Sequence, residues 1–126
     1  MKTATKVILS ALILIAVFIW TSLARSPESA GVNIYFFDVG QGDAELIQNG
    51  DYQILIDGGP SDEILSKLGE AMPIADRNIE IMILSHPHAD HLVGLNQVLE
   101  RYNVEKIYSS GVLHTSNEYL EFLEKV

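Results

Sequence analysis

The chain has 126 residues, a formal net charge of −9 and no cysteine. The lack of cysteine excludes disulfides, thiolate zinc sites and lipoprotein attachment. After residue 24, six basic residues (the eight of the chain less Lys2 and Lys6) face 17 acidic ones, which gives a net charge of −11. This charge favours solubility and repels nucleic-acid phosphates, except at a site where bound metals invert the local charge.

The first 24 residues differ from the rest of the chain. Lys2 and Lys6 form a short positive region, residues 7–20 are almost continuously apolar, and Ser22 and Ala24 fit a small-x-small cleavage site. The pattern predicts a signal peptide over residues 1–24, and an uncleaved membrane anchor through residues 7–23 is the alternative. Because positive residues stay inside, we expect the rest of the chain outside the cytoplasm, either secreted or membrane-anchored.

Residues 25–31 contain Ser, Pro and Gly and are expected to form a polar linker. Residues 32–126 alternate between strand and helix patterns and are expected to form one small domain. The expected strands cover residues 32–39, 44–48, 53–57, 79–84 and 104–108, with a hairpin turn at residues 49–51. The expected helices lie between Pro60 and Pro73, over residues 90–102, and from a capping box at residues 115–118 to the chain end. The strand over residues 79–84 is apolar enough to be buried on both faces.

The hexapeptide over residues 86–91, His-Pro-His-Ala-Asp-His, follows that strand. Such a pattern should occur by chance in on the order of one in ten thousand chains of this size. His86 and His88 project to one side of an extended segment, and Asp90 and His91 lie at a helix start, where a carboxylate is favoured. Imidazole and carboxylate groups are the usual ligands of zinc and similar divalent metals. A capping Asp90 among solvated loop histidines is the alternative, and it does not explain three histidines at ligand spacing.

The hexapeptide resembles the H-x-H-x-D-H motif of the metallo-β-lactamase superfamily. Residues 37–44, Phe-Asp-Val-Gly-Gln-Gly-Asp-Ala, resemble the opening motif of the hydrolase domain attached to ComEC-type DNA-uptake proteins and of its stand-alone secreted relatives. Residues 54–59, Ile-Leu-Ile-Asp-Gly-Gly, resemble a strand end found early in the same superfamily. The three motifs occur in family order, and the resemblance spans residues 32–126.

The resemblance implies an α/β (α+β) fold, the first half of an αββα metallo-β-lactamase-like sandwich. Family members have two such halves, whereas about 100 residues suffice for one small core only. We therefore expect residues 32–126 to be the N-terminal half of the domain in a fragment of a longer protein. A naturally short protein is the alternative.

The resemblance also implies the metal ligands. His86 and His88 would bind one divalent metal, and Asp90 and His91 would bind a second, with two zinc ions expected and manganese or iron as alternatives. Asp90 would in addition hold the nucleophilic water, which makes it the expected catalytic residue. The remaining family ligands would come from downstream. His114, the only other histidine, is expected to be a loop residue, with a substitute metal ligand as the alternative.

Three further aspartates are candidates for supporting roles. Asp57 could orient a metal ligand through hydrogen bonds or could be a plain turn residue before two glycines. Asp38 and Asp43 flank a glycine-rich turn, and each is expected to cap that turn, with support of the metal site or contact with substrate as the alternative.

By resemblance, the function is that of a metal-dependent hydrolase. The expected reaction is phosphodiester cleavage outside the cytoplasm, with DNA or a nucleotide as the candidate substrate. One alternative is a non-catalytic secreted or anchored module that keeps a partial metal site. Another is a thioester or lactam hydrolase of the same superfamily. The membrane is a partner only if residues 7–23 stay attached, and no specific protein partner is expected.

Overall fold

The structure is a computed structural model that describes residues 2–24 and 31–126, with side chains described for residues 5–21 and 31–126. The predicted linker, apart from Gly31, lies outside the described residues. Helix α1, Lys2–Ala24, contains the apolar N-terminal run, and its large side chains such as Phe18 and Trp20 are exposed. No helix in the described ranges combines the length and apolarity of a membrane span. The signal peptide or anchor over residues 1–24 stays a prediction.

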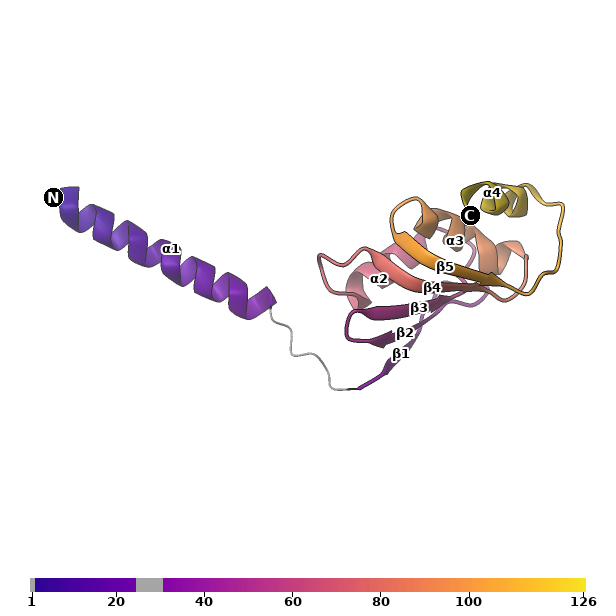
Figure 1. Ribbon diagram of the computed structural model, residues 1–126, viewed down its shortest axis with the longest axis horizontal. Helices are drawn as coiled ribbons and strands as arrows, with labels where there is room; N and C mark the ends of the chain where they lie inside the picture. Colours follow the sequence, from indigo (N-terminus) through magenta and orange to yellow (C-terminus); the bar gives the residue numbers. More distant parts are fainter. Residues whose placement is uncertain (1, 25–30) are drawn as a thin grey trace.

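A five-stranded mixed sheet forms the centre of the remaining chain (Figure 1). Its strands follow one another in chain order: β1 Asn33–Phe36, β2 Glu45–Asn49, β3 Tyr52–Ile56, β4 Asn78–Leu84 and β5 Asn103–Ser109. The pairs β1–β2 and β2–β3 are antiparallel, and the pairs β3–β4 and β4–β5 are parallel. Asn49 pairs with Tyr52, so the predicted hairpin between β2 and β3 is confirmed.

Helices α2, Glu63–Ala71, and α3, Ala89–Leu99, connect the parallel strands and contact each other on one side of the sheet (Figure 1). Helix α4, Asn117–Lys125, packs on α3. The core between helices and sheet is apolar and closed to solvent, and its fully buried members include Leu46, Leu55, Ile64, Leu68, Met82, Leu92 and Leu95. The mixed α/β class is as predicted.

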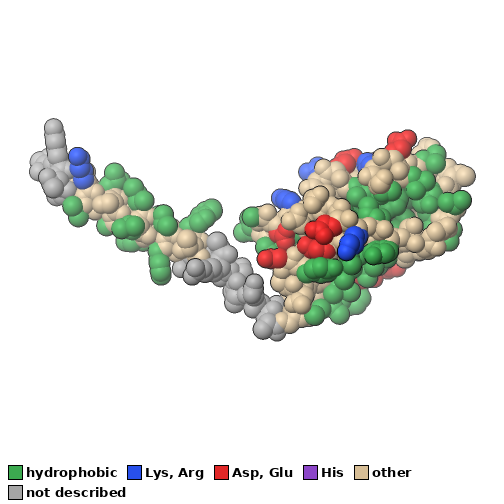
Figure 2. All heavy atoms as spheres, in the orientation of Figure 1, with side chains coloured by type: hydrophobic (Ala, Val, Ile, Leu, Met, Phe, Trp, Pro, Cys, Tyr) green, Lys and Arg blue, Asp and Glu red, His purple; other side chains and the backbone are tan. Residues whose placement is uncertain are grey.

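The second face of the sheet is only partly covered, so the expectation that β4 is buried on both faces is wrong for the described residues. Met82 and Leu84 face the helices and are buried, whereas Ile81 and Ile83 are half-buried. The reason is that α2 and α3 lie on the same face. Isoleucines pair across β1 to β4 on the other face, and Figure 2 shows hydrophobic side chains over β2 and β3.

Two helix starts differ from the predicted positions. The N-cap of α4 is Ser116 rather than Thr115, because the extended Ser116 backbone lets its hydroxyl accept a hydrogen bond from the Tyr119 N–H at 3.3 Å. The predicted capping box over residues 115–118 is therefore wrong, since a Ser116 cap has Tyr119 and not Glu118 at the third helical position. Helix α3 begins at Ala89, with His88 in the extended N-cap position, and not at Asp90. The helix still begins within the histidine motif, which sets the geometry of the site.

Candidate metal centre

The candidate site forms where β3 and β4 end beside the start of α3. Asp57 follows β3, and Ser85 and His86 follow β4. The two strands are parallel neighbours, so their carboxyl ends meet at one edge of the sheet. Helix α3 begins at the same edge and contributes Asp90 and His91 from its first turn.

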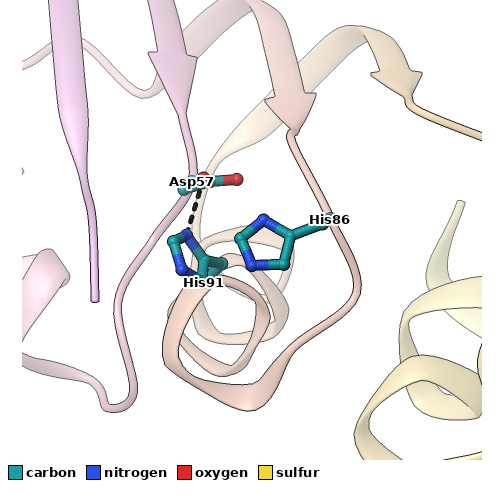
Figure 3. Close-up of side chains that lie close together, drawn as sticks. All are labelled: Asp57, His86 and His91. Carbon is teal, nitrogen blue, oxygen red and sulfur yellow. Dashed lines mark hydrogen bonds and ion pairs between the residues drawn. The ribbon is translucent and has the colours of Figure 1, made fainter. Parts of the chain in front are cut away.

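Two of the predicted ligands lie together with Asp57 at this edge. Asp57, His86 and His91 each offer a ligand atom, and these atoms lie within 4.8 Å of one another. Figure 3 shows the three side chains pointing toward one another. The ring centroid of His86 is 3.9 Å from that of His91 and 4.6 Å from that of His88. Asp90 Oδ1 is 3.9 Å from His91 Nε2, so the structure brings all four residues of the motif into one cluster with Asp57.

Asp57 is a buried carboxylate that accepts three hydrogen bonds. It is 2% exposed, and its donors are the Ser85 N–H at 2.8 Å, the Ser85 hydroxyl, and His91 Nδ1 at 2.9 Å. A buried carboxylate is costly unless such donors compensate it. Because a carboxylate only accepts, His91 must carry a proton on Nδ1, and in its neutral form its lone pair is on Nε2.

Ser85 extends the same argument to His86. The Ser85 hydroxyl has one hydrogen, which it donates to Asp57, and it lies 2.9 Å from His86 Nδ1. Its oxygen must therefore accept a hydrogen bond from His86 Nδ1–H, which places the lone pair of neutral His86 on Nε2. One carboxylate thus sets the tautomers of two predicted ligands. Sequence analysis missed Ser85, and its position directly between strand and motif was the only signal for it.

Close backbone packing fixes α3 against the end of β3. The Asp57 backbone has a φ of 55°, a left-handed conformation that turns the chain sharply there. The next residue, Gly58, donates its N–H to the His91 carbonyl oxygen at 2.8 Å. A Cβ on Gly58 would lie 2.5 Å from the Leu95 nitrogen, and one on Gly94 would lie 1.8 Å from the Gly58 oxygen. The helix that carries Asp90 and His91 can approach this closely only because both positions are glycine.

The glycine-rich loop after β1 closes the site from another side. A Cβ on Gly42 would lie 1.8 Å from the Asp90 carbonyl oxygen, so the loop backbone touches the start of α3. The Gln41 amide donates to Asp90 Oδ2 at 3.4 Å, a contact that sequence analysis also missed. Asp43 Oδ2 is 3.9 Å from His91 Nδ1, whereas Asp38 accepts from the Gly40 N–H at 3.3 Å in an exposed turn.

Two carboxylates of the site have shifted pKa values. Burial raises the pKa of Asp90, but hydrogen bonds from its own backbone N–H and from Gln41, with the nearby histidines, lower the pKa below its ordinary value overall. For Glu45, burial raises the pKa, Asp43 and Asp57 raise it further, and His91 lowers it by less. Asp90 is therefore a carboxylate at neutral pH, the form that binds a metal.

These residues fit a divalent metal. The donor set consists of imidazoles and a carboxylate, which suits zinc and related ions. In addition, His86 and His91 are each oriented by a hydrogen bond at Nδ1, the ring nitrogen that would not bind the metal. Metal-binding histidines in proteins are generally oriented in this way. His114 lies in the loop between β5 and α4, with its ring centroid 6.1 Å from that of His88.

Comparison with known proteins identifies a family model and similar solved structures. The family model of the metallo-β-lactamase superfamily matches residues 37–125. Among solved structures, the chain is similar to the Rm3 metallo-β-lactamase, with 28% identity and a TM-score of 0.48 over 59% of this chain and 28% of that one. It is also similar to the metallo-β-lactamase fold protein YhfI from Bacillus subtilis, with 29% identity and a TM-score of 0.44 over 64% of this chain and 34% of that one. The search of curated proteins gives no match.

The family model covers most of the chain, and the three motifs that it spans meet at one site. The chain covers only 28% and 34% of the two solved structures, so it corresponds to part of their length. On the match over residues 37–125, the chain belongs to the metallo-β-lactamase superfamily.

Proposed function

We propose that this chain supplies the first group of ligands of a metal-dependent hydrolase that cleaves phosphodiester bonds. The observation that carries the proposal is the buried Asp57 carboxylate, which directs the Nε2 lone pairs of His86 and His91 through hydrogen bonds. Such preorganisation is costly to build and is typical of metal ligands. We propose that the remaining metal ligands and the substrate-binding residues come from other parts of the whole protein.

The motif residues have separate roles in this proposal. His86 and His88 would hold one ion, and Asp90 and His91 would hold a second. A divalent ion bound there would lower the pKa of a water ligand toward neutrality and would stabilise negative charge on the scissile group. Asp90 accepts a hydrogen bond from the nucleophilic water, while Gln41 restrains its carboxylate. Asp57 contacts neither metal nor substrate and acts by orienting the two histidines.

The phosphodiester substrate is inferred from the loop over residues 37–44. Its sequence resembles the opening motif of ComEC-type hydrolase domains, and in the fold it lies directly against Asp90. The net charge of −9 opposes an extended nucleic-acid interface. We therefore infer that a DNA or nucleotide substrate contacts the chain mainly at the metal centre, where bound cations reverse the local charge.

We further propose that the hydrolase acts outside the cytoplasm. The support is the pair Lys2 and Lys6 ahead of the apolar run over residues 7–20 of α1, whose side chains are exposed. Cleavage of the segment is tested by N-terminal sequencing of the protein recovered from its native host.

The hydrolase is tested on the protein as its gene encodes it, loaded with zinc or manganese. Bis(4-nitrophenyl) phosphate and a DNA oligonucleotide are compared with a thioester and a lactam. We expect turnover of the phosphodiesters, nearly abolished in His86→Ala and Asp90→Asn and retained in Glu70→Gln, an exposed position on α2. Turnover of the thioester or lactam alone would refute the substrate class, and absence of bound metal from freshly purified protein would refute the hydrolase.

A non-catalytic metal-binding module is the second candidate. It is favoured by the tight grouping of only Asp57, His86 and His91 within 4.8 Å among the described residues. It predicts that the whole protein binds about one metal per chain and hydrolyses none of the four substrates. Metal analysis together with the turnover assay separates the two candidates.

A further inference from the structure

His114 lies outside the three motifs, yet it reaches the edge of the candidate metal centre. It belongs to the loop between β5 and α4 (Figure 1), and its ring centroid is 6.1 Å from that of His88 at an interplanar angle of 72°. Both of these rings are exposed, whereas His91 is buried. His114 is therefore placed at the solvent-exposed rim of the site.

The loop is anchored to the helix that carries the site. The Ser116 N–H donates to His114 Nδ1 at 3.2 Å, and Ser116 is also the N-cap of α4. Helix α4 is fixed on α3 by the buried Tyr119 and by a hydrogen bond from Asn96 to the Glu118 carbonyl oxygen at 2.9 Å. The His114 ring is thus oriented relative to α3 by a short chain of hydrogen bonds.

The Ser116 hydrogen bond decides what His114 can do. Because Nδ1 accepts a hydrogen bond, the neutral imidazole carries its proton on Nε2. A neutral imidazole that binds a metal through Nε2 must instead carry the proton on Nδ1. His86 and His91 have that second arrangement, since their Nδ1 atoms donate to Ser85 and Asp57. The local hydrogen bond therefore disfavours His114 as a metal ligand and leaves it as a donor.

We propose that His114 contacts substrate and donates an Nε2–H hydrogen bond to an oxyanion oxygen of the molecule bound at the metal centre. The proposal rests on the proposed hydrolase function and adds a binding residue to it. A phosphodiester presents non-bridging oxygens that accept such a bond, and a hydrogen bond to a charged acceptor is roughly twice as strong as a neutral one. The donor contributes to substrate affinity without holding the metal.

The experiment compares His114→Gln with His114→Asn in the whole, metal-loaded protein. The Gln amide nitrogen extends to the position of the imidazole Nε2, whereas the Asn amide nitrogen extends only to that of Nδ1. Inorganic phosphate binding is measured by calorimetry, and metal content is measured in the same samples. We expect His114→Asn to weaken phosphate binding by about tenfold or more, His114→Gln to stay within about threefold of the wild type, and all three to hold equal metal.

Other outcomes overturn the proposal in distinguishable ways. Loss of metal from both variants would show that His114 is a ligand. Unchanged phosphate affinity in His114→Asn, or no phosphate binding by metal-loaded wild type, would show that the ring contacts no oxyanion, whatever the turnover. Nitrogen-15 NMR of the metal-free protein adds a readout independent of activity. It should show His114 protonated on Nε2 in its neutral form, and protonation on Nδ1 alone would refute the argument.

Discussion

Replacing Asp57 by asparagine should weaken metal binding while leaving the backbone in place. Asp57 has a φ of 55°, a left-handed conformation that asparagine adopts more readily than most residues. The change therefore removes the carboxylate charge and replaces one acceptor oxygen with a donor. An amide cannot accept from the Ser85 N–H, the Ser85 hydroxyl and His91 Nδ1 as the carboxylate does.

The expected effect follows from the hydrogen bonds that are lost. Partners that orient a metal-binding histidine typically change metal affinity by about 10- to 100-fold, which corresponds to about 1.4–2.8 kcal/mol. One hydrogen bond to a charged group contributes about 1.5–3 kcal/mol, so the loss of a single such bond accounts for this range. Ser85→Ala removes the hydroxyl that donates to Asp57 and contacts His86, but it leaves the hydrogen bonds of Asp57 with the Ser85 N–H and His91. It should therefore have the smaller effect, about tenfold or less.

Zinc affinity in the whole protein is measured by competition with a chromogenic chelator, and circular dichroism confirms that each variant is folded. We expect the order wild type, Ser85→Ala, Asp57→Asn from tightest to weakest binding. A folded Asp57→Asn protein that binds zinc within about twofold of the wild type would show that the carboxylate does not set the histidine tautomers.

Two further predictions concern the fold around the site. Gly42→Ala should be much less stable to thermal unfolding than Gly40→Ala. Both glycines have positive φ angles, so either substitution strains the backbone by about 1–3 kcal/mol, but only a Cβ on Gly42 clashes, 1.8 Å from the Asp90 carbonyl oxygen. Equal melting temperatures of the two variants would contradict the close approach of the loop to α3. For Glu100, the hydrogen bond and charge of Lys125 lower the pKa, so the interaction adds stability above the ordinary value of 4.5 and loses it as the pH falls below that value. Glu100→Gln should therefore lower the melting temperature near pH 7, and this difference should shrink as the pH falls below 4.5 through the lowered pKa of Glu100.

The order of elements and the location of the site follow from sequence because they depend on local patterns. The apolar run over residues 79–84 ends just before the histidine motif, and in the structure β4 ends at Leu84 with α3 beginning five residues later. A strand, an extended His-Pro-His segment and a helix start leave little choice of geometry. That is why His86 and His88 lie as close as the alternation of an extended chain implies.

The support of the site could not be predicted in the same way. Asp57 is 28 residues from Ser85 and 34 from His91, so its hydrogen bonds depend on the parallel pairing of β3 with β4. The sequence leaves open whether such an aspartate orients a ligand or only turns the chain, because both uses place it before two glycines. The shift of the α4 cap from Thr115 to Ser116 has a related cause, since two adjacent hydroxyl residues compete and only packing selects one.

The contacts of the glycines explain why the motifs identify the fold of the site more securely than its substrate. Gly42 makes room for the Asp90 backbone, and Gly58 and Gly94 make room for each other. These contacts need glycine whatever bond the protein cleaves. The glycines of the motifs therefore indicate how β3, the loop after β1 and α3 pack together, and not which substrate is bound. Side chains that face the bound molecule are free of this constraint. Substrate choice should therefore depend on residues such as His114, which can change without disturbing the backbone that holds the metal ligands.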